Sequence, residues 1–384
     1  MKALVLGGGA QGSAAAFDLV RHPDVESVVI ADRAVSRPPP FLEAFLGPRL
    51  ELRTLDAGDP RAVGAAMAGV DGVLCALPYF FNYDMTALAV AAGAHYCDLG
   101  GNTEIVARQR GLDAEARRLA LSVIPDCGLA PGMVNILAQA GIDGLDRADS
   151  VRLFVGGLPQ HPRPPLNYQI VYSLQGVLDY YTTPSVVLEG GKLVTKRALS
   201  EVENVTFPDP VGTLEAFHTA GGVSTMPQRY LGAIPDMVYK TLRYPGHARV
   251  MESIRELGLF GTDPIRVNGN EVVPRDLFIE VATPYLTGGD PRDLVALRVV
   301  VRGTRDGAPR TIRYDVLDRY DEEHGITAMM RTTGYSLAVT TLMQVDGRVR
   351  EHGVRTPDEA ILADEYIREL AGRGIEIARS ESSS

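Results

Sequence analysis

An apolar run, a glycine-rich turn and an alanine-rich segment follow one another at the start of the chain, and this succession most constrains the fold. The run at residues 3–6 predicts a short buried strand, and residues 11–21 carry apolar side chains at helical spacing. A second apolar run, over 28–31, ends at Asp32, about twenty residues after the turn. The turn itself matches G-x-G-x-x-G at Gly7, Gly9 and Gly12. Together these features predict a Rossmann-type βαβ unit that binds a dinucleotide.

Each part of this unit has a physical task in holding a dinucleotide. Glycines allow a sharp bend and a close approach of backbone N–H groups to a pyrophosphate, whose charge the helix dipole stabilises. Asp32 would accept hydrogen bonds from the ribose hydroxyls and repel a 2′-phosphate, which favours NAD over NADP. NADP stays possible, because Arg33 could stack on the adenine or pair with that phosphate. The alternative interpretation is a tight turn with Asp32 as a solvated acid. The residues that we expect to contact the cofactor are Gly7, Gly9, Ala10, Gln11, Gly12, Asp32, Arg33, Asp56, Leu77 and Pro78.

Composition limits the class of protein. A chain of 384 residues has room for two or three domains, and a net charge of −10 without a basic run argues against a nucleic-acid partner. The apolar stretches are too short to span a membrane, and Met1 leads directly into a core strand instead of a cleavable signal, so we expect a cytoplasmic protein without a membrane partner. Its 3 cysteines cannot form a disulfide framework, and no Cys/His spacing predicts a metal site.

Strands and helices alternate over residues 1–140, which predicts an α/β fold with a doubly wound parallel sheet. We expect further strands in 49–59, 71–78, 94–101 and 121–128, and helices over 60–70, 84–92 and 103–120, with one more starting at Pro131.

Residues 141–325 have a different character and predict an inserted α+β domain. Strand-like runs crowd together at 150–157, 168–173, 186–194, 213–219, 294–303 and 310–320, and two helices are expected at 246–260 and 273–286. Residues 326–375 should form helices that pack back onto the first domain, and the Ser-rich tail should be disordered.

The carboxyl ends of the central strands are where an open α/β sheet builds its site, so the segments 76–84, 97–103 and 125–135 are the first candidates. Asp98 and Asp126 are the leading acids there, although Asp98 could equally form a turn or cap a helix. In the second domain, 215–227 and 242–247 have the composition of binding loops. His218 could be catalytic or a structural histidine, and Arg243 could bind a carboxylate or form a surface ion pair.

Six segments in their order along the chain resemble the saccharopine dehydrogenase-like family, and within it most closely the lysine 6-dehydrogenases. They are "VLGGGAQGS", "YCDLGG", "PDCGLAPGMVN", "LNYQIVYSLQGVLDYY", "GGVSTMP" and "LRYPGH". The resemblance implies a Rossmann domain interrupted by a substrate and dimerisation domain, and therefore a homo-oligomer, either a dimer or an assembly of dimers. Saccharopine-forming members carry Arg-Asp where this chain has Gly222 and Val223, and they differ at Ala130 and Asn135. These departures point to a smaller substrate such as free lysine.

The implied reaction is oxidation of the ε-amine of lysine by NAD, followed by loss of ammonia to give the semialdehyde. By resemblance Asp98 or His218 would be the base, Tyr79, Asn82 and Asp126 would shape the pocket, and the α-carboxylate would be bound by Arg243, Ser224 and Thr225 with Tyr168 close by. A saccharopine-type reductase and a nucleotide-binding protein without turnover remain alternatives.

Overall fold

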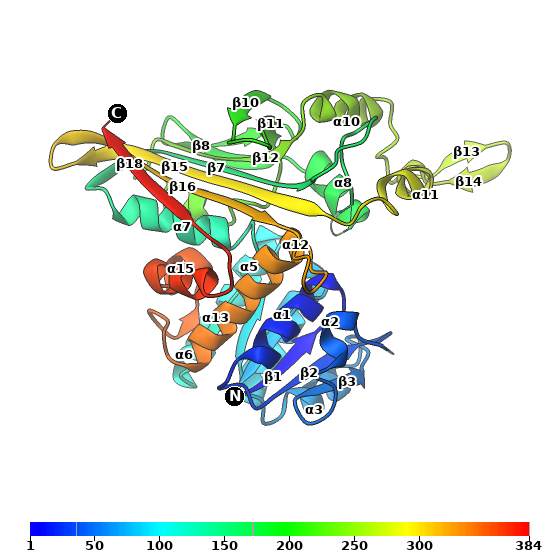
Figure 1. The fold of residues 1–384 in the computed structure, drawn as a ribbon, viewed down its shortest axis with the longest axis vertical. Helices are drawn as coiled ribbons and strands as arrows, with labels where there is room; N and C mark the ends of the chain where they lie inside the picture. Colours follow the sequence, from blue (N-terminus) through cyan, green and yellow to red (C-terminus); the bar gives the residue numbers. More distant parts are fainter. Residues whose placement is uncertain (36, 171–172, 384) are drawn as a thin grey trace.

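A parallel sheet of seven strands forms the centre of the N-terminal domain in the computed structural model, which describes residues 1–35, 37–170 and 173–383 (Figure 1). The strand order is β17-β6-β5-β4-β1-β2-β3, and every neighbouring pair is parallel. The strands are β1 (Lys2–Leu6), β2 (Ser27–Asp32), β3 (Leu50–Thr54), β4 (Gly72–Cys75), β5 (His95–Asp98), β6 (Ser122–Ile124) and β17 (Gly353–Val354). This sheet and its helices are called the Rossmann domain below.

Helices cover both faces of that sheet, as the alternation predicts. They are α1 (Ala10–Arg21), α2 (Pro40–Glu43), α3 (Pro60–Met67), η1 (Tyr79–Phe81), α4 (Asn82–Ala92), α5 (Thr103–Gln109), η2 (Arg110–Leu112), α6 (Asp113–Arg118) and α7 (Met133–Asp143). The expected long helix over 103–120 is divided into α5, η2 and α6. Gly111 lies in the tight middle turn, where its weak helix propensity explains the interruption.

A mixed sheet of nine strands forms the second domain, so the expected fold class is confirmed. Its main order is β10-β11-β12-β7-β15-β16-β18, with β8 beside β12 and β9 beside β8, and β12 and β7 are the parallel pair. The strands are β7 (Arg147–Pro159), β8 (Ser185–Glu189), β9 (Lys192–Lys196), β10 (Glu203–Thr206), β11 (Thr213–His218), β12 (Asp236–Arg243), β15 (Asp293–Arg305), β16 (Ala308–Arg319) and β18 (Ala378–Ser383). Its helices are α8 (Leu174–Thr182), α9 (Met226–Arg229), α10 (His247–Glu256) and α11 (Pro274–Leu286), and a separate hairpin of β13 (Ile265–Val267) and β14 (Asn270–Val272) projects beside α11 (Figure 1).

Three expectations for the second half of the chain are wrong. The run at 186–194 is a hairpin of β8 and β9, because Gly190 and Gly191 both have positive φ and form its turn. Residues 168–170 and 173 are not in a strand, and the rest of that expected strand, 171–172, lies outside the described residues. The tail is also ordered up to residue 383. It forms β18, which pairs with the edge strand β16 (Figure 1). Glu381 of β18 forms an ion pair with Arg305.

One apolar core joins the two domains. Leu74 and Ile124 of the first sheet belong to the same buried cluster as Leu153 and Leu297 of the second. Helix α7 lies between the sheets (Figure 1), and Gly141 on it faces Val301 so closely that a methyl group there would stand 2.5 Å from a Val301 methyl carbon. The relative position of the two domains is therefore fixed largely by packing.

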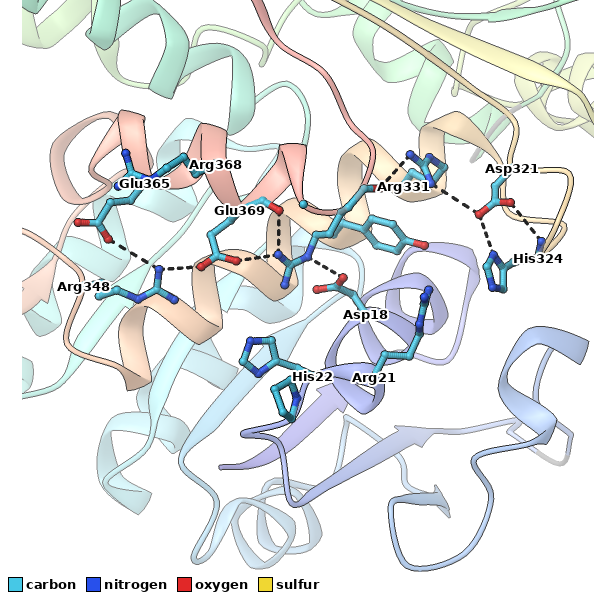
Figure 2. Close-up of a pocket in the computed structure, with 14 residues that line it drawn as sticks. Asp18, Arg21, His22, Asp321, His324, Arg331, Arg348, Glu365, Arg368 and Glu369 are labelled. Carbon is cyan, nitrogen blue, oxygen red and sulfur yellow. Dashed lines mark hydrogen bonds and ion pairs between the residues drawn. The ribbon is translucent and has the colours of Figure 1, made fainter.

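The C-terminal segment returns to the Rossmann domain through α12 (Ala328–Met330), a π-helical turn η3 (Arg331–Tyr335), α13 (Ser336–Val345), α14 (Pro357–Ala360) and α15 (Ala363–Ala371). Gln344 of α13 donates hydrogen bonds to the carbonyl oxygens of Tyr96 and Ser122, at 2.9 Å each. Beyond α15, the Arg373 guanidinium donates a hydrogen bond to Asp18 of α1 at 2.7 Å. Figure 2 shows Asp18 and its surroundings. Both ends of the returning segment are thus bonded to the first sheet and its helices.

Candidate functional site

Two glycines of the first turn are required by close backbone contacts. A methyl group on Gly12 would stand 1.9 Å from the Gly7 carbonyl oxygen, and one on Gly7, whose φ is +100°, would stand 2.8 Å from the Ala76 carbonyl oxygen. A methyl group on Gly9 would meet no atom within 4 Å, so Gly9 leaves an open side above the turn. The turn has the shape that the approach of a pyrophosphate needs.

The N-terminus of α1 is available to an anion. The helix has 12 residues, and among the described residues no side chain caps its first turn. The first turn of a helix leaves N–H groups unpaired and carries partial positive charge. These residues therefore fit the pyrophosphate of a dinucleotide.

Asp32 is held beside this turn at the end of β2. Its Oδ2 accepts a hydrogen bond from the Gly8 N–H and its Oδ1 one from the Ala34 N–H, both at 2.8 Å. The carboxylate is half-buried, and each oxygen keeps a further lone pair for a ribose hydroxyl. Arg33 is exposed beside it. Asp56 is exposed beyond β3, where it accepts from the Gly58 N–H at 2.9 Å.

A cavity of about 400 Å³ lies between the nucleotide turn and the second domain. Gln11, Leu77 and Pro78, which were expected to contact the cofactor, line it from the Rossmann domain. The same wall includes Ala76, Leu99, Gly100, Leu129, Met329 and Thr333. The opposite wall comes from the second domain and includes Val155, Gly157, Ser173, Tyr180, Thr219, Tyr239, Thr241 and Arg243.

Arg243 is the sole charged side chain among the described residues that line the cavity. It is 4% exposed, its Nη1 donates to the Leu242 carbonyl oxygen at 2.8 Å, and its Cζ lies 4.8 Å from the centre of the Tyr168 ring. A buried guanidinium beside an aromatic ring and a cavity suits a carboxylate. The structure thus places Arg243 and Tyr168 together, as expected.

His218 does not reach this cavity. It pairs in register with Lys240, whereas Thr241, the next residue on β12, lines the cavity, and successive side chains of a strand point to opposite faces. On its own face the His218 Nε2 lies 3.1 Å from Glu201, and burial lowers the pKa of the imidazole. The expectation that His218 is catalytic is therefore wrong, because alternate side chains of a strand point to opposite faces and His218 points away from the cavity.

Asp98 also lies away from the cavity wall, although the neighbouring Leu99 and Gly100 form part of it. The carboxylate is fully buried, and its Oδ1 accepts from the backbone N–H groups of Gly100 at 2.8 Å and Asp126 at 3.2 Å. Its Oδ2 accepts from the Gln109 side chain at 2.7 Å. Burial raises the pKa of Asp98 to about 6. These contacts hold the ends of β5 and β6 together and leave Asp98 no direct access to a ligand.

Asp126 contacts the second domain. It has a positive φ of 66°, and its Oδ2 accepts a hydrogen bond from the Ser224 hydroxyl. Its Oδ1 is buried without a partner among the described residues. Burial, above all, raises the pKa of Asp126 to about 7.

The other expected substrate residues are spread around the cavity. Ser224 and Thr225 line a neighbouring cleft of about 1010 Å³ and do not join Arg243. Asn82 is buried and accepts a hydrogen bond from the Cys75 thiol, so it belongs to the core. Tyr79 is 41% exposed beside Gly101, outside the cavity wall.

Sequence reasoning missed the two tyrosines of the wall, Tyr180 on α8 and Tyr239 on β12. Each ring packs against a glycine of the "GGVST" loop, residues 221–225. A methyl group on Gly221 would stand 2.9 Å from the Tyr180 ring, and one on Gly222 would stand 2.3 Å from the Tyr239 ring. The double glycine was the signal that could have indicated a close-packed aromatic pair.

In the described part of the chain no helix is long and apolar enough to cross a bilayer, and no group of three His, Cys, Asp or Glu side chains is placed to hold a metal ion.

Comparison with known proteins gives a consistent result along the whole chain. The sequence model "Saccharopine dehydrogenase NADP binding domain" matches residues 3–122, and "Saccharopine dehydrogenase C-terminal domain" matches residues 128–375. The chain is 22% identical to the NADP(+), L-glutamate-forming saccharopine dehydrogenase of Schizosaccharomyces pombe, over 93% of this chain and 96% of that protein. The Saccharomyces cerevisiae enzyme of the same name is 23% identical, over 83% of this chain and 85% of that protein.

Solved structures agree on the fold. The apo L-Glu-forming saccharopine dehydrogenase from Saccharomyces cerevisiae superposes with a TM-score of 0.81 at 19% identity, covering 100% of both chains. The homospermidine synthase from Legionella pneumophila in complex with NAD superposes with a TM-score of 0.69 at 12% identity, covering 100% of this chain and 91% of the other.

Proposed function

The chain belongs to the saccharopine dehydrogenase family of oxidoreductases, and from this premise we propose that it oxidises the ε-amine of L-lysine, or of a similar basic amino acid, with NAD. The products are the semialdehyde, ammonia and NADH. Arg243 carries the proposal as the sole charged group among the described residues of the cavity wall.

One buried cation suits one substrate carboxylate. Saccharopine, the compound in the names of the two fungal relatives, carries three carboxylates. Each would need a cationic or hydrogen-bonding partner on transfer from water into a cavity of about 400 Å³. A free α-amino acid carries a single carboxylate, for which one guanidinium is sufficient.

The packing of the wall gives the substrate a direction. Tyr168, which stacks on Arg243, belongs to a cluster formed within the second domain. Tyr239 belongs to the cluster that includes Leu129 and Met133 of the Rossmann domain. We place the carboxylate at Arg243 and the amine toward Tyr239, on the side of the apolar cluster shared with the Rossmann domain.

NAD is the cofactor that Asp32 favours. The Asp32 carboxylate is fixed by two backbone N–H groups where the adenosine ribose binds in a Rossmann domain, and its charge opposes a 2′-phosphate. The matching family model and the two fungal relatives carry NADP in their names, so NADP is the alternative, and the exposed Arg33 is the residue that would serve it.

The chemistry divides between cofactor and protein. When bound, the dinucleotide accepts a hydride from the carbon next to the amine. Gln11, Leu77 and Pro78 would position it, and Arg243 would orient the amino acid.

We assign proton movement to Tyr180, whose side chain lines the cavity. Burial raises the pKa of Tyr180, so its phenol stays neutral and can accept and pass on a hydrogen-bonded proton. The Tyr180 hydroxyl lies against Gly101, since a methyl group there would stand 3.5 Å from it, and Asp126 lies against Gly100.

A coupled assay tests the proposal. The purified protein is incubated with L-lysine and NAD, and NADH formation and ammonia release are measured together. Equal amounts of both support oxidative deamination. Activity only in the reverse direction, with NADPH, the semialdehyde and glutamate, would establish the reductase alternative. Tight NAD binding by calorimetry without turnover of any basic amino acid would establish a non-catalytic protein.

A further inference from the structure

Three side chains of one strand line the cavity in succession. Tyr239, Thr241 and Arg243 alternate along β12, and all three belong to the cavity wall. Side chains two residues apart share a face of a strand, and their Cα atoms are about 6.6 Å apart. The row therefore extends about 13 Å from the Tyr239 Cα to the Arg243 Cα.

The two ends of this row differ in chemistry. At one end Arg243 is buried against the Tyr168 ring. At the other end the Tyr239 ring lies in the apolar cluster shared with the Rossmann domain. Thr241 lies between them, and its hydroxyl is 2.7 Å from that of Thr219. A polar anchor, a hydroxyl pair and an aromatic end follow one another along the strand.

Gly222 fixes the position of the aromatic end. A methyl group on Gly222 would stand 2.3 to 2.5 Å from three atoms of the Tyr239 ring, so the ring is packed directly on this backbone. The backbone is itself held by the Rossmann domain, because Asn135 donates from its Nδ2 to the Val223 carbonyl oxygen at 3.1 Å. The ring cannot move toward the loop without breaking these contacts.

We infer that β12 limits the length of the substrate. An amino acid whose carboxylate is bound by Arg243 extends toward Tyr239, and the Tyr239 ring, packed against Gly222, limits the length of the substrate's side chain. This inference rests on the proposed function, since it takes a terminal amine and a single carboxylate as the two ends of the substrate. Tyr239 and Gly222 are then the residues that determine specificity within one substrate class, the straight-chain α,ω-diamino acids.

A homologous series of substrates tests this inference. The kcat/KM of each variant is measured with 2,4-diaminobutyrate, ornithine, lysine and homolysine. The wild type should prefer one length, expected to be lysine. Tyr239→Leu removes part of the barrier and should raise the homolysine-to-lysine ratio about tenfold or more, which is the discrimination that one methylene group usually supplies. Gly222→Ala pushes the ring into the cavity and should raise the ornithine-to-lysine ratio by a similar factor.

Two further variants serve as controls. Tyr239→Phe keeps the ring and should keep the wild-type order of substrates. Gly111→Ala places a methyl group where no atom lies within 4 Å, far along the chain from the cavity wall, and should change no ratio. If Gly222→Ala does not fold, Tyr239→Leu alone still decides the question.

The outcomes separate the inference from the proposed function. Suppose that the wild type oxidises lysine and that Tyr239→Leu leaves the kcat/KM ratios between substrates of different length unchanged. This result would overturn the inference that β12 limits substrate length and would leave the proposed function intact. Failure of the wild type to oxidise any member of the series would overturn both.

Discussion

Ser224 donates a hydrogen bond from its hydroxyl to Asp126, and this bond joins the loop after β11 to the end of β6 across the domain boundary. Asp126 is buried, and burial raises its pKa to about 7, with a smaller upward contribution from Asp98 and an opposing one from the Ser224 hydrogen bond. Two residues that were expected to contact substrate thus contact each other. Their bond holds the loop whose glycines seat Tyr180 and Tyr239.

Replacing Asp126 by Asn should change the pH dependence of stability. The pKa of Asp126 is raised in the folded state from 3.8 to about 7, so the folded protein holds this proton more tightly than the unfolded chain between these values. Stability is therefore lost as pH rises through that interval. The amide introduced by Asp126→Asn does not titrate, so the free energy of unfolding of this variant should increase relative to wild type from pH 4.5 to pH 8, by on the order of 2–4 kcal/mol.

Urea unfolding at several pH values measures this difference. Asp263→Asn, in an exposed loop, is the matched control variant and is unfolded at the same pH values. A constant difference between Asp126→Asn and wild type would show that Asp126 ionises normally in the folded protein.

Replacing Arg243 by Met should separate carboxylate binding from cofactor binding. The variant removes the buried cation and keeps much of the side-chain volume, so KM for lysine should rise about 10- to 100-fold, in line with the loss of a charge-assisted hydrogen bond. The Kd for NAD should stay within about twofold of the wild-type value, because the contacts of Arg243 are with residues of the second domain.

Cadaverine, which is lysine without its carboxylate, provides the control substrate for Arg243→Met. Its kcat/KM should be nearly equal in wild type and variant. An equal loss with both substrates would mean that Arg243 shapes the cavity without binding a carboxylate.

The sequence predicted those parts of the molecule that depend on local pattern. The spacing of Gly7, Gly9 and Gly12 predicts the turn because each contact is made within one βαβ unit. Arg243 was expected either to bind a carboxylate or to form a surface ion pair, and the fold shows that it is buried in the cavity wall. The strand that carries His218 could be recognised, whereas residues 242–247 were expected to form a loop and the strand that ends at Arg243 was missed. The register between these two strands decides which side chain faces the cavity, and that register depends on distant packing.

Other features carry no local signal. Tyr180 and Tyr239 lie at apolar positions of a helix and a strand, where an aromatic residue is typical of the core. The tail was expected to be disordered because it is poor in apolar residues, but β18 is held by backbone pairing with β16 and by the contacts of Glu381 with Arg305 and Arg310. Asp98 follows a strand in the same way as a catalytic acid would, and only the fold shows that it turns inward to Gln109.

Replacing Asp32 by Ala should reverse the cofactor preference. The substitution removes a carboxylate that can accept two ribose hydrogen bonds, so NAD binding should weaken by on the order of 2–4 kcal/mol, whereas NADP loses a repulsive neighbour as well and should weaken far less. The KM values for NAD and NADP, measured at saturating lysine, give the cofactor preference.

Asp32→Asn serves as the control. Asp32 also accepts hydrogen bonds from the Gly8 and Ala34 N–H groups, and the Asn side chain preserves one such acceptor. A KM for NAD that does not change in Asp32→Ala would remove Asp32 from the adenosine ribose.

Replacing Arg373 by Met should destabilise the attachment of the C-terminal helices to α1. The Arg373 guanidinium donates to Asp18 at 2.7 Å and to Glu369 at 2.7 Å, in a pocket where the two partners Asp18 and Arg373 are 9% and 13% exposed (Figure 2). Burial already raises the pKa of Asp18, and its Oδ2 has no partner among the described residues, so losing the cation leaves a buried carboxyl with less compensation. The free energy of unfolding should fall by about 3 kcal/mol, as for other broken buried pairs, and the loss should grow as pH rises because Asp18 is then forced to ionise. Arg118→Met breaks the exposed pair with Glu115, which solvent screens, and should change the free energy of unfolding far less than Arg373→Met does. Equal and small losses in the two variants would mean that apolar packing of α13 and α15, and not the Asp18–Arg373 pair, holds the returning segment in place.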